Sequence, residues 1–139
     1  MPKPPATVDL VWNGRLEFTV TTPKTTFVID SASVAGPSPV DALVAALAGC
    51  MAMDLAHILT KGRHPFTEMR AKLVAERSPD NPHRLMSVTL HFVLGGLGEG
   101  AAPLDAVRRA IALSRDTYCS VWHSLRQDIP FQVTFDVAP

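Results

Sequence analysis

Residues 36–62 have the sequence GPSPVDALVAALAGCMAMDLAHILTKG, and this stretch decides the fold of the chain. Ser38 followed by a proline is a typical helix start, because the serine side chain caps free backbone amides and proline fits the first helical position. Gly62, with Pro65 soon after it, is a typical helix end. Between these signals apolar residues recur at helical spacing and alanines fill the other faces. We therefore expect one helix over residues 39–61.

This predicted helix is apolar on nearly every side. Its most apolar part, Ala42 to Ala52, is shorter than the roughly 20 residues that a membrane span requires, and Asp41 and Asp54 bracket it. We therefore expect a buried helix and no membrane partner. Six short strands and one further helix offer too little surface to bury it on all sides, so a second copy of the chain is the simplest cover.

The segment before this helix has the pattern of three strands. Residues 8–12 and 16–20 are strand-like and are separated by Asn13 and Gly14, a dipeptide typical of tight hairpin turns with positive φ. Residues 25–30 follow as a third strand.

The segment after the helix returns to a period of two. Residues 66–76 and 86–94 alternate apolar and polar side chains and are expected to form an antiparallel pair. Pro103 starts a second amphipathic helix, and residues 131–137 close the chain as a strand. The order is β-β-β-α-β-β-α-β, an α+β fold with a long buried central helix, in one domain over residues 1–139.

Composition and motifs exclude several functions. The chain has 139 residues, 47% of them hydrophobic, which suits one domain with a sizeable core. Thirteen basic and thirteen acidic residues give a net charge of zero, so we expect no nucleic-acid partner. The first five residues contain three prolines and no apolar run, unlike a signal peptide, so we expect a cytoplasmic protein. The sequence has no nucleophile elbow, P-loop or dinucleotide fingerprint.

The two cysteines are the candidate chemical groups. Cys50 and Cys119 are 69 positions apart, which excludes a C-x-x-C dithiol and a paired zinc knuckle. One interpretation of Cys50 is that it is only a small, buried hydrophobic residue without a chemical role. However, Gly49 beside it is costly in a helix interior and indicates that some group approaches the helix closely there.

Cys119 follows Asp116 and Thr117, and two arrangements fit its surroundings. If one of these residues caps a new helix after a break near Ser114, Cys119 lies in the first turn, where the helix dipole favours a thiolate and lowers the pKa. If one helix runs unbroken from 103 to 127, Cys119 is a packing residue.

Metal binding is a further alternative. Cys119 and His123 are four positions apart, and Cys50, Asp54 and His57 lie near one another on one helix. Such spacing often arises by chance in helices, so we expect no metal and no cofactor, and we expect His57 to form hydrogen bonds at the helix end.

Three segments resemble the OsmC/Ohr family, the osmotically inducible and organic-hydroperoxide-resistance proteins. Residues 36–54 are similar to the first cysteine helix of that family. Residues 110–114 and 118–121 are similar to its second cysteine segment, and Glu76-Arg77 before a proline-containing loop fits the piece between. The resemblance extends over nearly the whole chain from about Val8 onward, and it favours the OsmC-like branch over the hydroperoxide-resistance enzymes proper.

The resemblance implies an intertwined homodimer in which sheets from both chains wrap the long helices. It implies that Cys50 is the peroxidatic nucleophile, which reduces an organic hydroperoxide and becomes a sulfenic acid, and that Cys119 is the resolving cysteine, which closes a disulfide. A dithiol or lipoyl group would then reduce the disulfide. The alternative is a non-enzymatic dimer that binds an apolar small ligand near Cys50.

The peroxidase function requires a group that activates Cys50, because burial in mid-helix raises the pKa of a thiol. The hydroperoxide-resistance branch uses an arginine near the N-terminal hairpin with a glutamate near the start of the cysteine helix. Here Val40 occupies the glutamate position and Asp41 is adjacent to it. Arg15 is the nearest candidate for the arginine, and its alternative role is a surface charge.

Overall fold

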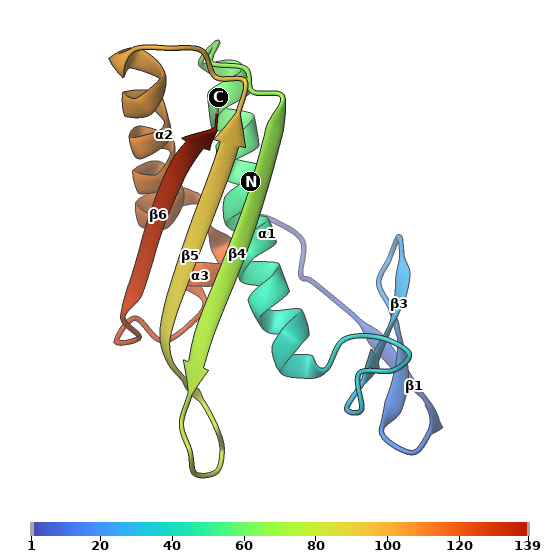
Figure 1. Ribbon diagram of the computed structural model, residues 1–139. Coiled ribbons are helices and arrows are strands. Elements are labelled where there is room, and N and C mark those ends of the chain that lie inside the picture. The colour runs from blue at the N-terminus through green and yellow to red at the C-terminus, as the bar shows by residue number, and fades with distance from the viewer. Residues whose placement is uncertain (1, 139) are drawn as a thin grey trace. The chain divides into compact units, whose positions relative to one another are not determined.

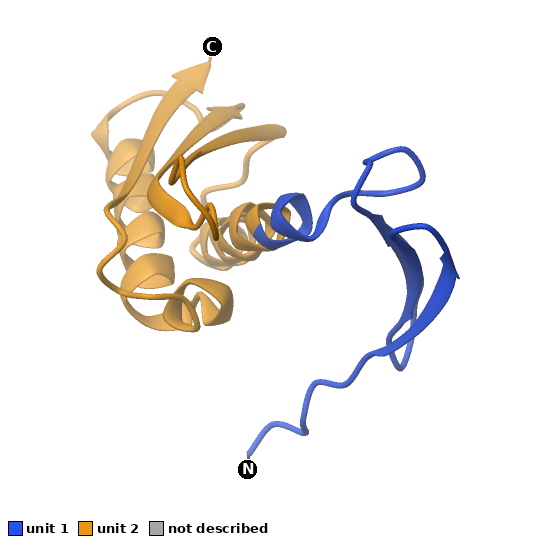
Figure 2. Ribbon diagram, turned by 90° about the horizontal axis from the view of Figure 1, so that it is seen from below, with its two compact units in different colours: residues 1–43 blue, residues 44–139 orange. Residues whose placement is uncertain are grey.

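The computed structural model describes residues 2–138, which form two compact units that divide between residues 43 and 44 and are called unit 1 and unit 2 (Figures 1 and 2). The predicted order of strands and helices is confirmed, with a π-helical turn and a third helix added before the last strand. The single domain over residues 1–139 stays a prediction. The elements are β1 (Asp9–Gly14), β2 (Glu17–Thr21), β3 (Thr26–Asp30), α1 (Pro39–Lys61), β4 (Glu68–Arg77), β5 (Leu85–Gly95), α2 (Ala101–Leu113), the π turn η1 (Ser114–Tyr118), α3 (Ser120–His123) and β6 (Phe131–Ala138).

Unit 1 contains the antiparallel sheet β1-β2-β3. Because Trp12 pairs with Phe18, and Phe18 with Ile29, most apolar side chains of the three strands share one face, and Val11 and Val28 lie on the other. Of the side chains on this face only Val20 is buried, and Trp12 is 65% exposed. The unit 1 apolar face consists of Leu10, Trp12, Phe18, Val20, Phe27 and Ile29.

The first hairpin turns one or two residues later than the sequence predicts. Gly14 belongs to β1, where a bulge between Trp12 and Gly14 shifts the register, and Arg15 and Leu16 form the turn. Gly14 and Arg15 both have positive φ, 111° and 51°. The Trp12 Nε1 donates a hydrogen bond to the Arg15 carbonyl at 2.8 Å, which helps to hold the arginine in this uncommon conformation.

Unit 2 is a three-stranded sheet with helices on one face (Figures 1 and 2). β4 and β5 are antiparallel as predicted, and β6 pairs in parallel with β5. From Val88 to Leu94 every second side chain of β5 is buried, whereas a bulge near its start places Leu85 inside and leaves Met86 exposed. The core consists of Leu47, Met51, Leu55 and Leu59 from α1, Val88, Leu90, Phe92 and Leu94 from β5, and Ala106, Val107 and Ala110 from α2.

Helix α1 has the predicted bounds, Pro39–Lys61, and Ser38 caps it by accepting a hydrogen bond from the Asp41 amide at 3.2 Å. The single chain buries only one side of the helix, and burial of its other sides stays a prediction. Its buried residues form one stripe at every fourth position, whereas Met53 is 73% exposed. The full helix is also long and apolar enough to cross a membrane by length and composition, with 22% of its most apolar 18 residues buried.

Candidate active site

The fold of unit 2 brings the two cysteines together. Cys50 lies in the middle of α1 and is half-buried, and Cys119 lies between η1 and α3 and is fully buried. Both are free thiols, and Cys50 is close enough to Cys119 to raise its pKa. Two thiols that are 69 positions apart in the sequence therefore share one site, whereas their separate catalytic roles stay predictions.

The segment that carries Cys119 is neither of the two arrangements considered from the sequence. The Cys119 amide donates to the Ser114 carbonyl at 2.8 Å, a hydrogen bond from residue i+5 to residue i that closes a π turn. Cys119 itself, not Asp116 or Thr117, is the N-cap of α3, and its Sγ accepts from the Trp122 amide at 3.4 Å. At Ser114 the α-helix changes into the π turn, and the chain leaves helical geometry only at Cys119.

The environment of Cys119 disfavours its thiolate. Burial is the main cause and raises its pKa to about 11, although the hydrogen bond from the Trp122 amide acts in the opposite direction. The Cys50 thiol and the Asp54 carboxylate raise this pKa further. The prediction that a helix dipole lowers it is wrong, because α3 has only four residues and Cys119 is out of contact with water.

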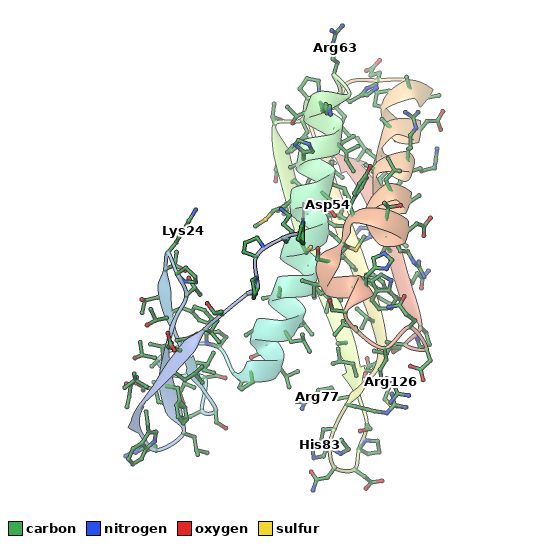
Figure 3. The ribbon with its side chains drawn as sticks, turned by 180° about the vertical axis from the view of Figure 1, so that it is seen from behind. Lys24, Asp54, Arg63, Arg77, His83 and Arg126 are labelled. Carbon is green, nitrogen blue, oxygen red and sulfur yellow. The ribbon has the colours of Figure 1, made fainter. Side chains whose placement is uncertain are left out.

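A carboxylate and a hydroxyl lie next to the two thiols. Asp54 is four positions after Cys50 on α1, and the hydroxyl of the fully buried Ser114 donates to its Oδ2 at 2.7 Å. Figure 3 shows Asp54 on α1. From the sequence, Asp54 was only a metal candidate and Ser114 only the place of a helix break. A carboxylate one turn after a cysteine, in an otherwise apolar helix, is the signal that could have found this pair.

Aromatic rings support the buried side of the site. The rings of Trp122 and Phe131 are 4.5 Å apart between centroids, and both residues are buried. The Arg115 guanidinium lies over the Phe131 ring, 5.4 Å from its centroid. Since the Trp122 amide also holds the Cys119 Sγ, the position of this sulfur is tied to a packed aromatic pair.

Arg15 lies in unit 1, and the cysteines lie in unit 2, so its activating role stays a prediction. Its side chain is exposed, and its charge contributes to lowering the pKa of Asp30. The larger causes of that lowered pKa are hydrogen bonds from three backbone amides, those of residues 32, 34 and 35. Val40 and Asp41 form the first turn of α1.

The sequence predicted a close approach at Gly49 and left metal binding as an alternative. Apart from its chain neighbours and the adjoining helix backbone, no described atom lies within 4 Å of the position that a Cβ on Gly49 would occupy, so no other part of the described chain approaches closely there. Among residues 2–138, no three His, Cys, Asp or Glu side chains are grouped so that they could hold a metal ion. Cys119 and His123 therefore have no third ligand of these types in the described part of the chain.

Comparisons with known proteins agree with this description. The family model described as OsmC-like protein matches residues 30–134. Protein YhfA of Escherichia coli K12 is 35% identical over 101 residues, which cover 73% of each chain. A hypothetical protein from Aquifex aeolicus has the same fold, with a TM-score of 0.86 at 21% identity over 98% of both chains. OhrB, the organic hydroperoxide resistance protein of Bacillus subtilis, gives a TM-score of 0.59 at 14% identity over 95% of this chain and 98% of its own.

Proposed function

Since the chain belongs to the OsmC-like protein family, we propose that it is a thiol-dependent peroxidase that reduces organic hydroperoxides with Cys50 and Cys119. The observation that carries this proposal is the meeting of two free thiols from α1 and from the segment after η1. A solved structure of the same fold is an organic hydroperoxide resistance protein, which supports the choice of substrate class.

The two thiols have different parts in this reaction. Cys119 is buried and has a pKa of about 11, so it stays protonated near pH 7. The half-buried Cys50 is therefore the attacking thiol. Its thiolate attacks the terminal peroxide oxygen, the O–O bond breaks, and the alcohol leaves after taking up a proton, so that Cys50 becomes a sulfenic acid.

The second step closes a disulfide. The Cys119 sulfur attacks the Cys50 sulfur, the S–O bond breaks, and the Cys119 proton leaves with the hydroxyl group as water. A dithiol or lipoyl reductant then returns both cysteines to thiols and becomes a disulfide itself. This cycle needs no cofactor, and it fits a reducing compartment such as the cytoplasm.

Arg15 is our candidate for the cation that favours the Cys50 thiolate. A positive charge close to a thiol lowers its pKa, and this effect would offset the cost of mid-helix burial. We expect Arg15→Ala to slow the reaction of Cys50 with hydroperoxide by roughly tenfold or more. Lys24→Ala is the matched control, since Lys24 is an exposed cation of the same unit (Figure 3). If Cys50 reacts with hydroperoxide equally fast in Arg15→Ala and Lys24→Ala, Arg15 does not activate Cys50.

The working form is proposed to be a homodimer. The unit 1 apolar face has one buried side chain among six, and Met53 lies exposed on the side of α1 away from its buried stripe. A soluble chain does not usually leave so much apolar surface in water, and a second copy supplies apolar surface of the same kind.

Sedimentation of the purified protein without detergent tests the homodimer. We expect twice the mass of one chain, and we expect Met53→Lys to shift the protein towards the monomer. Met86→Lys is the control, because Met86 is also an exposed methionine but lies on β5. A monomeric wild type would contradict the homodimer, and a protein that stays in solution only with detergent would indicate that α1 inserts in a membrane.

Consumption of cumene hydroperoxide with dithiothreitol as reductant tests the activity. We expect the wild type to turn over, Cys50→Ser to be inactive, and Cys119→Ser to stop at a Cys50 sulfenic acid that dimedone traps. Hydrogen peroxide in parallel tests the substrate class, and equal rates with both peroxides would contradict the preference for organic hydroperoxides. If the wild type is as inert as Cys50→Ser, the enzyme proposal fails and a ligand-binding role replaces it.

A further inference from the structure

Ser114 is joined to both cysteine-bearing segments at once. Its hydroxyl donates to Asp54 Oδ2 on α1 at 2.7 Å, one helical turn after Cys50. Its carbonyl accepts the Cys119 amide at 2.8 Å and so closes the π turn. A single residue therefore links the helix that presents Cys50 to the backbone that presents Cys119.

The burial of Ser114 gives this link its strength. Ser114 is completely buried, and a buried hydroxyl that loses its partner is left without a hydrogen bond, because water cannot replace the partner. Hydrogen bonds to a carboxylate are shorter and stronger than neutral ones, and 2.7 Å is a typical length. The π turn therefore has one preferred position against α1, with the Cys119 sulfur next to Cys50.

We propose that Ser114 and Asp54 are positioning residues for disulfide closure: their hydrogen bond holds the π turn on α1, so that the Cys119 sulfur is in place to attack the Cys50 sulfenic acid. This inference deepens the proposed function and rests on it for the identity of the oxidant. The closure itself converts Cys50 sulfenic acid and Cys119 thiol into a disulfide and one water, so Asp54 and Ser114 neither gain nor lose atoms in it.

The position of the thiols can be measured without any hydroperoxide. In buffers of reduced and oxidised dithiothreitol, the fraction of protein with a Cys50–Cys119 disulfide gives the equilibrium constant for closure. This equilibrium constant is larger when the folded chain holds the two sulfurs close together, and smaller when one of them has more conformational freedom. It therefore reports on positioning even if hydroperoxide turnover is absent, so failure of the proposed function and failure of this inference are separate results.

Ser114→Ala is the principal variant, because it removes only the hydroxyl oxygen and keeps the backbone bond that closes the π turn. We expect the closure constant to fall by roughly tenfold, the usual effect of one lost hydrogen bond. Asp54→Asn keeps an oxygen that can accept from the Ser114 hydroxyl, and it should stay within roughly threefold of the wild type. Asp116→Ala is the control, an exposed carboxylate of the same turn that should change nothing.

A kinetic experiment separates positioning from a general structural defect. After one equivalent of cumene hydroperoxide, Ser114→Ala should form the Cys50 sulfenic acid at the wild-type rate but close the disulfide more slowly, so that dimedone labelling increases. Circular dichroism confirms that each variant is folded, and if Ser114→Ala does not fold, Asp54→Ala takes its place against Asp54→Asn. Closure constants within twofold of the wild type in a folded Ser114→Ala, or equal losses in Asp54→Asn and Ser114→Ala, would overturn the proposal.

Discussion

Cys50 lies in the regular middle of a 23-residue helix, whereas Cys119 is an extended residue between a π turn and a helix of four residues. Cys50 is half-buried and Cys119 is fully buried, and only the Cys119 sulfur accepts a backbone hydrogen bond. The comparison teaches that two thiols in one site can have different surroundings, one partly open to solvent and one held in its protonated form by burial.

The largest effect that we expect concerns alkylation. With a pKa of about 11, roughly one Cys119 in a thousand is ionised at pH 8, against about one in ten for an ordinary thiol of pKa 9.0. Folding should therefore slow the reaction of Cys119 with iodoacetamide by roughly a hundredfold, with Cys50 reacting first. Peptide mass spectrometry of folded and urea-unfolded protein measures both cysteines together. Equal alkylation rates at Cys50 and Cys119 in the folded protein would contradict the proposed roles of Cys50 as attacking thiol and Cys119 as resolving thiol.

The second prediction is a loss of stability in alkali. The pKa of Cys119 is raised in the folded state, so its contribution is fully present below the unfolded value of 9.0 and is lost as the pH rises towards 11. The free energy of unfolding of the reduced protein should fall over this range by up to about 3 kcal/mol. Urea unfolding at several pH values measures it.

A Cys119→Ala control corrects that measurement for the other groups that titrate in alkali. The groups that face Cys119 are Cys50 and Asp54 on α1 and the Trp122 amide on α3, and all of them remain in this variant. The difference in the free energy of unfolding between the wild type and Cys119→Ala gives the contribution of the Cys119 thiol at each pH. A difference that does not change with pH would show that Cys119 has an ordinary pKa.

The third prediction concerns the π turn. Deletion of the exposed Thr117 shortens it by one residue, and one residue corresponds to about 100° of rotation around a helix axis. Cys119 should turn away from Cys50, and the equilibrium constant for disulfide closure should fall by roughly tenfold or more. Thr117→Ala keeps the number of residues in the turn, and its equilibrium constant for disulfide closure should equal that of the wild type. A deletion variant that closes as well as the wild type would show that the turn is not required.

The smallest effect that we expect lies on the Cys50 side. Nothing lies within 4 Å of a Cβ at Gly49, and alanine is favoured over glycine in a helix interior by about 1 kcal/mol. Gly49→Ala should therefore stabilise the chain by up to that amount, as measured by urea unfolding at fixed protein concentration. A loss of stability instead would show that the space beside Cys50 is filled in the assembled protein.

The sequence was sufficient where local signals decide the structure. The bounds of α1 follow from Ser38 before Pro39 and from Gly62, because capping and backbone conformation act over a few residues. The alternation along β5 likewise predicted that its side chains from Val88 to Leu94 face the core, but it was wrong for Met86, which is exposed while Leu85 is buried.

Features that depend on distant contacts were not predicted. The hydrogen bond from the Ser114 hydroxyl to Asp54 joins residues that are 60 positions apart, and no local pattern marks it or the π turn that starts at Ser114. The first hairpin turns at Arg15 instead of Asn13-Gly14, because β1 continues through a bulge and Trp12 bonds to the Arg15 carbonyl. The pKa of Cys119 was misjudged for the same reason, since its burial comes from the packing of the whole unit.

The π turn also affects how related sequences should be compared. Cys119 is five positions after Ser114, and that count fixes the direction in which its sulfur points. A relative with one residue fewer between the serine and the cysteine could keep both cysteines in an alignment and still hold no dithiol. If Ser114 positions Cys119 as proposed, we expect the spacing from this serine to the second cysteine, and not the presence of two cysteines alone, to decide whether a family member forms a disulfide.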